Sequence, residues 1–160
     1  LCSCLDIKVG VIFMIKETPR NIEELKKKAN NKNSWRERLS AVNVLKEYDC
    51  KQSKDILARL AINDPVFKVK ETAFRAAQAL GVTSHGNPIY LGKGKKGNLV
   101  KGINKKLEKV RNSLPDDYSF EDFKSEFQKK YPSAYDVYEG TKKDFDGWLK
   151  KSEANLPHRK

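Results

Sequence analysis

Residues 63–81 read NDPVFKVKETAFRAAQALG, and this stretch decides the fold class. Its apolar side chains recur at every third or fourth position, at Val66, Val69, Ala73, Ala76 and Leu80. That period predicts a helix with one face to bury. Asp64 and Pro65 are typical of the start of a helix, and Gly81 is typical of the residue after its end. We therefore expect an all-α protein.

A second copy of this pattern precedes the first. A shift of 32 residues maps residues 21–48 onto residues 53–80. The matched positions are Leu25 with Leu57, Ala29 with Ala61, Arg36 with Lys68, Arg38 with Lys70, Ala41 with Ala73, and Val44 with Ala76. Ser34 and Glu37 have the spacing of a capping box, which places a helix start inside the earlier copy. The sequence thus predicts two repeats, each a pair of helices.

The run of Asp-Pro, Val-Lys, alanines and a closing Leu-Gly in residues 63–81 resembles the HEAT repeat. The resemblance covers roughly residues 20–81, and the chain as a whole resembles small bacterial HEAT-repeat proteins. It implies a short helical solenoid that works as a binding scaffold. It also implies that the Arg or Lys residues at the matched positions can be structural.

Two repeats are fewer than the three or so that a solenoid usually needs, because each end leaves an apolar face open. The next segment, residues 98–114, predicts an amphipathic helix with Leu99, Ile103, Leu107, Val110 and Leu114 in one stripe. We expect this stripe to cover Val69, Ala73 and Ala76. Homodimerisation is the alternative, so a monomer or a weak homodimer is expected.

The predicted organisation is an N-terminal extension (1–18), HEAT-like repeats (19–81), a Gly/Lys-rich linker (82–97) and a helical C-terminal module (98–156). Met14 is the single methionine and a possible true start, with a weak signal peptide as the competing hypothesis. No apolar run approaches the length of about 18 residues that a membrane span needs. We expect a cytoplasmic protein that binds no membrane.

Positive charge is concentrated in the middle of the chain. The whole chain has 33 basic and 21 acidic side chains, for a net charge of +12. Residues 83–111 hold eight basic side chains and one acidic one, whereas residues 112–160 are close to neutral. Such a field raises the local concentration of polyanions, although a solubilising surface is the alternative interpretation.

Lys101, Lys105 and Lys109 follow one another at i+4 steps on the predicted helix, where like charges repel. A line of positive charge kept at that cost suits the regular spacing of phosphates, with a solvated helix face as the alternative. The candidate nucleic-acid-binding residues are Lys93, Lys95, Lys96, Lys101, Lys105, Lys109 and Arg111, with Arg36, Arg38, Lys68 and Lys70 from the repeats. Tyr90 in the linker either attaches the linker to the repeats or offers a ring for base stacking.

Aromatic residues dominate the C-terminal module. Phe120, Phe123, Phe127 and Tyr131 lie on one side of a predicted helix, and Phe145 and Trp148 lie on a last helix at residues 141–155. This spacing indicates a core. The break near Pro132 superficially suggests a helix-turn-helix, but Asp136 and Glu139 would repel the phosphates beside a major groove.

No catalytic residue, cofactor or metal site is predicted. The chain has no zinc spacing, phosphate loop or nucleophile elbow, and its two histidines lie in the linker and near the C-terminal end. We expect a non-catalytic protein that contacts nucleic acid or a ribonucleoprotein. A protein-interaction scaffold is the first alternative. The second is a HEAT-like DNA repair enzyme, suggested by Trp35 beside Arg36 and Arg38.

Overall fold

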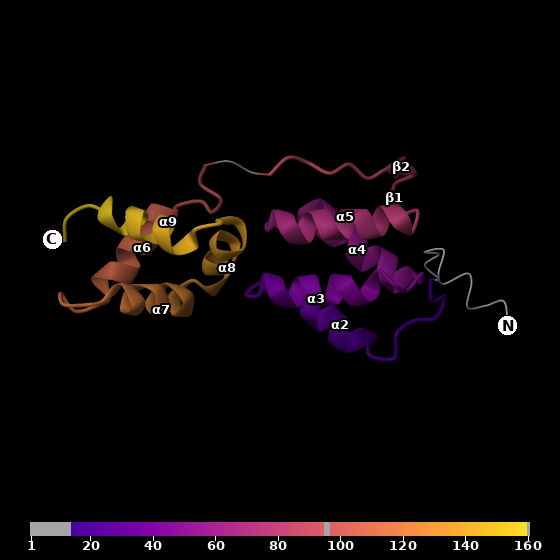
Figure 1. Cartoon of the computed structure of the whole chain (residues 1–160), viewed down its shortest axis with the longest axis horizontal. Helices are drawn as coiled ribbons and strands as arrows, with labels where there is room; N and C mark the ends of the chain where they lie inside the picture. Colours follow the sequence, from indigo (N-terminus) through magenta and orange to yellow (C-terminus); the bar gives the residue numbers. More distant parts are fainter. Residues whose placement is uncertain (1–13, 95–96, 160) are drawn as a thin grey trace.

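The computed structural model describes residues 14–94 and 97–159, and helices dominate this part of the chain (Figure 1). The helices are α2 (Ile22–Ala29), α3 (Trp35–Leu45), α4 (Lys51–Asn63), α5 (Phe67–Ala79), α6 (Ile103–Asn112), α7 (Phe120–Lys130), α8 (Pro132–Thr141) and α9 (Phe145–Ala154). The prediction of an all-α protein is confirmed. None of the helices in the described ranges is long and apolar enough to cross a membrane.

Helices α2 to α5 form the N-terminal module as two neighbouring pairs, α2 with α3 and α4 with α5. Leu45, Leu57 and Val69 are fully buried between them in a first core. The Ser34 hydroxyl accepts the Glu37 N–H at 3.2 Å, so the predicted start of α3 is confirmed. Helix α5 begins two residues later than Pro65, because Asp64 instead accepts the Val66 N–H at 2.9 Å in the preceding turn.

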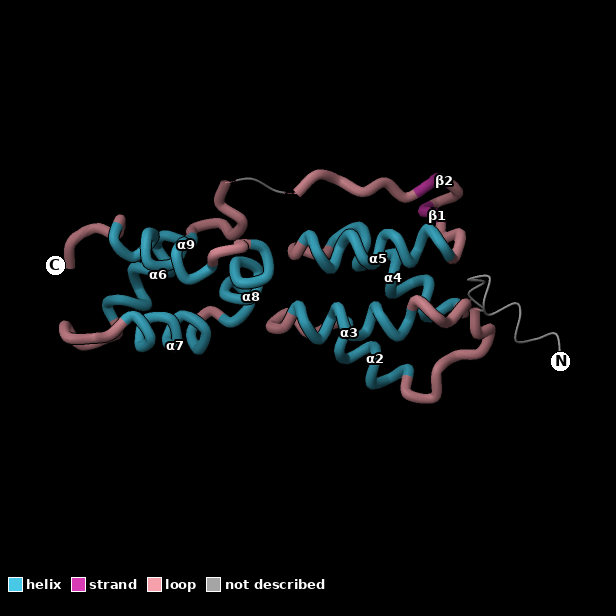
Figure 2. Tube along the Cα trace, viewed as in Figure 1, coloured by secondary structure: helices cyan, strands magenta, loops and turns pink. Residues whose placement is uncertain are grey.

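The linker leaves α5 through Gly81, whose φ of +69° is the predicted left-handed conformation. A two-residue hairpin follows, β1 (Thr83–Ser84) paired antiparallel with β2 (Asn87–Pro88). The chain then runs back alongside α5 in an extended form toward the second module (Figure 2). The prediction that no long regular element lies here agrees with this course.

Helices α6 to α9 form the C-terminal module around a second core. Its fully buried side chains include Ile103, Leu107, Phe123, Phe127 and Leu149. Tyr138 stacks on Trp148 with ring centroids 4.1 Å apart. The prediction that these aromatics form a core is therefore confirmed.

Several element boundaries in this module differ from the prediction. Helix α6 begins at Ile103 rather than residue 98, because Gly102 has a φ of +71° and ends any continuous helix there. Pro132 starts α8 instead of only breaking α7, since a proline fits the first helical turn. Ser119 and Asp122 form a reciprocal capping box at the start of α7, as their spacing predicts.

The expectation that α6 covers α5 is wrong. Ile103, Leu107 and Val110 are buried in the second core, against the aromatic helices of their own module. The stripe on α5 offers them no open face, because Val69 and Ala73 are already fully buried in the first core. The two modules meet instead through α8, which packs against α3 and α5.

Candidate nucleic-acid interface at the module junction

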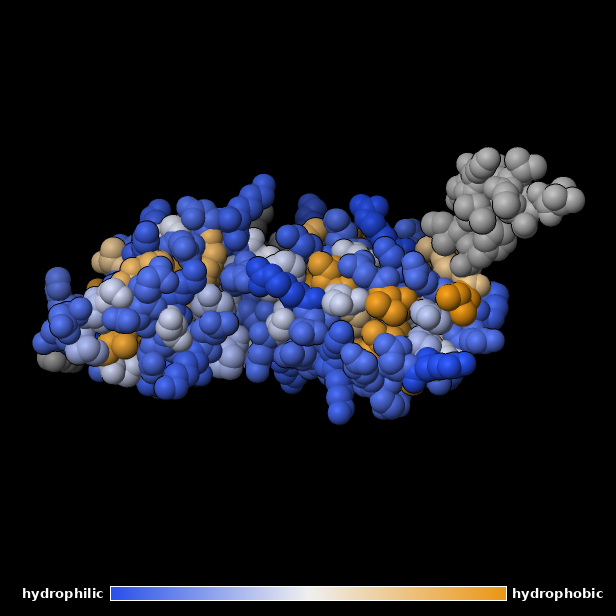
Figure 3. All heavy atoms as spheres, turned by 60° about the horizontal axis from the view of Figure 1, so that its bottom comes forward, coloured by the Kyte–Doolittle hydropathy of each residue, from blue (hydrophilic) through white to orange (hydrophobic). Residues whose placement is uncertain are grey.

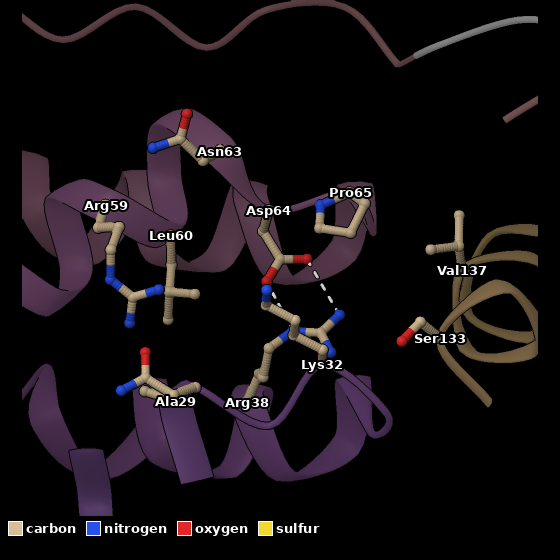
Figure 4. Close-up of a pocket in the computed structure, with 11 residues that line it drawn as sticks. Ala29, Lys32, Arg38, Arg59, Leu60, Asn63, Asp64, Pro65, Ser133 and Val137 are labelled. Atoms are coloured by element: carbon tan, nitrogen blue, oxygen red, sulfur yellow. Dashed lines mark hydrogen bonds and ion pairs between the residues drawn. The ribbon is translucent and has the colours of Figure 1, made fainter. Parts of the chain in front are cut away.

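A buried ion network holds the two modules together. Arg38 of α3 donates from Nε and Nη2 to Asp64 at 2.8 and 3.2 Å, and from Nη1 to Asp136 of α8 at 3.0 Å. Figure 4 shows Arg38 and Asp64 pointing toward each other, with Ser133 and Val137 of α8 facing them across the junction. All three charged side chains are at least nine-tenths buried. Removing one of them would therefore leave a buried charge that has lost a partner and that water cannot solvate.

The environment shifts the pKa of both Arg38 and Asp136. Burial raises the pKa of Asp136 more than the Trp35 N–H and Arg38 lower it. Burial alone would lower the pKa of Arg38, but Asp64 and Asp136 outweigh it and raise this pKa. The network therefore keeps Arg38 charged, and this charge is paired with Asp64 and Asp136 inside the contact between the modules.

The start of α3 adds a second set of contacts with α8. Asp136 Oδ1 accepts the Trp35 backbone N–H at 2.6 Å, and Glu139 Oε2 accepts the indole N–H of Trp35 at 3.1 Å. Glu139 also forms an ion pair with Arg36. Asp136 and Glu139, whose negative charge argued against a helix-turn-helix, thus bind the N-terminal module. These contacts join α8 to the start of α3.

Three adjacent hollows surround this contact. The first, of about 480 Å³, is lined by Lys32, Arg59, Pro65 and Val137 among others. The second, of about 260 Å³, is lined by Pro65, Phe67, Lys70, Lys93 and Val137 among others. The third, of about 550 Å³, is lined by Arg36, Phe67, Lys68, Lys142 and Lys143 among others. Since neighbouring hollows share lining residues, we treat them as one feature, the junction groove.

The junction groove carries uncompensated positive charge. Its acidic lining residues each have an arginine partner: Asp64 pairs with Arg38, Glu139 with Arg36, and Glu71 with Arg75. Seven basic lining residues form no ion pair with any residue that the structure describes: Lys32, Arg59, Lys68, Lys70, Lys93, Lys142 and Lys143. They come from separate segments, which only the fold brings together. The groove can therefore attract an anionic ligand.

Lys70 illustrates how this charge arises. It occupies the position in the second repeat that Arg38 occupies in the first. Arg38 has two buried carboxylate partners, whereas Lys70 has none within the described chain and lines the groove beside Lys93. The same repeat position thus holds a buried, paired cation in the first repeat and a cation without an ion-pair partner in the second.

The residues predicted from sequence fall into four groups, of which the lysines near α6 are the last. Arg36, Lys68, Lys70 and Lys93 line the groove, although Arg36 is paired with Glu139. Arg38 and Arg111 are buried, so neither presents a charge at the surface. Lys95 and Lys96 lie outside the described residues, as does the segment before Met14 on which the proposed start depends.

The lysines near α6 form a different surface. Lys101, Lys105 and Lys109 are exposed and line none of the hollows at the junction. Only Lys105 and Lys109 are on α6, because Lys101 precedes the left-handed Gly102. The expected row of three stacked lysines on one helix is therefore wrong, because only two of the three lysines lie on the helix.

Sequence reasoning missed four groove residues, namely Lys32, Arg59, Lys142 and Lys143. None of them belongs to a motif, and no spacing links residues 32, 59 and 142 along the chain. The docking of α8 on α3 and α5 is what unites them. A signal for this docking existed only in the acidic residues Asp136 and Glu139.

Candidate metal ligands do not cluster within the described ranges. No group of three or more His, Cys, Asp or Glu side chains gathers there in a way that could hold a metal ion. Comparisons with protein-family models, with curated proteins and with solved structures return no match. The resemblance to HEAT repeats consequently stays a prediction from the residues themselves.

Proposed function

We propose that this chain is a non-catalytic binding protein of HEAT type that holds a nucleic acid, free or within a ribonucleoprotein, in the junction groove. The observation that carries the proposal is the charge imbalance of the groove. Its carboxylates are paired with arginines, while seven of its basic side chains have no ion-pair partner among the described residues. Phosphates are the ligands that such a surface attracts most strongly.

The architecture supports the HEAT part of the proposal. Helices α2 and α3 correspond to the first predicted repeat, and helices α4 and α5 correspond to the second. Asp64, in the turn between the second pair of helices, pairs with Arg38 of the first pair. A contact of this kind couples neighbouring repeats, which is how a solenoid gains its stability.

The test compares two sets of four Lys→Gln changes. The groove set changes Lys70, Lys93, Lys142 and Lys143. The control set changes Lys27, Lys46, Lys129 and Lys130, which lie outside the groove and form no ion pair in the described chain. Both sets remove the same charge, and glutamine is a good helix former. Binding to a labelled duplex and to a labelled single strand is then measured by fluorescence anisotropy over a range of salt concentrations.

We expect the groove set to weaken binding far more than the control set. For each lysine that meets a phosphate, the slope of log K against log salt should fall by roughly 0.9 on duplex DNA or 0.7 on single strands. A third variant changes Lys101, Lys105 and Lys109 to glutamine. It measures how much the surface near α6 contributes to nucleic-acid affinity. Equal losses from the groove and control sets would remove the groove from the binding surface.

A protein-interaction scaffold is the second candidate, and one observation favours it. On the face that Figure 3 shows, the largest group of hydrophobic side chains lies over the N-terminal module, with smaller groups over the C-terminal module. Ile15 and Ile62 are 41% and 43% exposed, so apolar contact area is available on this module. Absence of nucleic-acid binding by the wild-type protein at low salt would favour this candidate over the first.

A further inference from the structure

Tyr90 is the most exposed large hydrophobic residue in the described chain, at 80%. It forms no hydrogen bond or ring contact with any described residue. A tyrosine normally buries much of its ring, because that ring carries a large apolar area. Tyr90 therefore keeps an aromatic face in water, where another planar group can stack on it.

The neighbours of Tyr90 hold it in this position. Ile89 packs against the first core, in a hollow at the far end of α5 lined by Phe74, Gln78 and Val82. Leu91 is half-buried on the other side of Tyr90 in the sequence. Successive side chains of an extended segment point to opposite sides, so Ile89 and Leu91 share one side and Tyr90 lies on the other, where it is exposed. The ring is thus held next to Ile89, which packs against the first core.

The same segment leads from Tyr90 to the junction groove. Lys93, three residues further on, lines the groove with Lys70. An extended chain covers about 10 Å in three residues. Gly92 and Gly94 flank Lys93, and a Cβ on either would lie 3.8 Å from Lys70 Nζ or the Phe67 ring. A ligand approaching the linker backbone here meets two cations without intervening side chains.

Resting on the proposed function, we infer that the ligand of the junction groove is a single-stranded nucleic acid, with one base stacked on Tyr90 and the adjoining phosphates held by Lys93 and Lys70. A duplex cannot use Tyr90 in this way, because its bases already cover one another. A single strand has free base faces, and base–aromatic stacking with a cationic groove is the usual basis of single-strand binding. DNA and RNA strands share this chemistry.

The decisive experiment compares Tyr90→Ala with Tyr90→Phe in the full chain. Each variant is titrated against a single-stranded DNA of roughly 16 nucleotides, the RNA of the same sequence, and the corresponding DNA duplex. Because Tyr90 is exposed, neither change should alter the fold, and circular dichroism checks this. The expected result is a loss of at least about five-fold in single-strand affinity for Tyr90→Ala, with Tyr90→Phe within about two-fold of wild type.

The outcomes separate the inference from the function on which it rests. Duplex affinity should be unchanged in Tyr90→Ala. Equal losses on single strand and duplex, or no loss on single strand, overturn the stacking role while leaving the groove as a nucleic-acid site. Failure of the wild-type protein to bind any of the three probes at low salt overturns the proposed function itself. The DNA and RNA arms show which strand is preferred once stacking is established.

Discussion

The indole ring of Trp35 in α3 lies directly against Gly140 in α8. A Cβ atom on Gly140 would come within 2.7 Å of Trp35 Cδ1, closer than van der Waals contact permits. The absence of a side chain at residue 140 is therefore what lets the two modules approach. Glu139, beside it, accepts the indole N–H and holds the ring in place.

Gly140→Ala should destabilise the protein. Alanine normally favours a helix interior over glycine by roughly 0.5–1 kcal/mol, but here its methyl group overlaps a buried ring. Overpacking typically costs about 1–3 kcal/mol, so we expect a net loss of about 1–2 kcal/mol in the free energy of unfolding in urea. Adding Trp35→Phe, a smaller ring, should recover part of the loss in a double-mutant cycle. A stabilised Gly140→Ala protein would refute the close contact.

Arg38→Ala should cost about 3–5 kcal/mol, because it leaves Asp64 and Asp136 buried without their cation. Arg36→Ala is the matched control. Arg36 lies two residues earlier on the same helix and pairs with Glu139, but its side chain is 65% exposed, so its loss should cost less than about 1 kcal/mol. Asp136→Asn should cost less than Arg38→Ala, since it keeps an acceptor for the Trp35 N–H. Similar costs for the two arginine changes would contradict the network.

Leu107→Ala and Leu45→Ala should affect different halves of the molecule. Both leucines are fully buried, Leu107 in the second core and Leu45 in the first, so each change should cost about 2–5 kcal/mol. Hydrogen exchange should show Leu107→Ala exposing the amides of α6, α7 and α9 more than those of α4 and α5. Leu45→Ala should have the reverse effect. Uniform loss of protection in both variants would show that the two cores unfold as one.

Acid should weaken the attachment of the segment after Met14. Hydrogen bonds from Lys16 and Lys54 lower the pKa of Asp49 to about 2. Because this pKa lies below the unfolded value of about 4, Asp49 stabilises the folded state above pH 4, and the contribution is lost as the pH falls toward 2. The difference in melting temperature between wild type and Asp49→Asn should therefore shrink over that interval. A constant difference from pH 6 to pH 2 would count against the ion pairs.

Local sequence patterns predicted the helices well because their causes are local. The Ser34 and Ser119 caps, the left-handed Gly81 and the aromatic spacing of α7 each act within one or two turns. The start of α6 was predicted too early for a similarly local reason. Gly102 adopts a positive φ, and the apolar stripe on either side of it does not reveal this.

The docking of the modules could not be predicted from the same patterns. An apolar stripe shows that a helix face is buried, but not which surface buries it. The apolar residues of α6 pack against the aromatic residues of their own module. The sequence likewise does not show which basic residues are paired in the interior and which remain unpaired. Arg38 and Lys70 occupy equivalent repeat positions, yet Arg38 is buried between Asp64 and Asp136, whereas Lys70 has no ion-pair partner among the described residues.

The contact between Trp35 and Asp136 joins residues 101 positions apart, and from this separation we expect a definite order of folding. Each module is built largely from neighbours in the chain, so it can form quickly, whereas closing so long a loop is slower and entropically costly. The junction is consequently the last part of the molecule to assemble. A nascent or partly folded chain has both cores available before it has any groove, so binding competence follows folding rather than accompanying it.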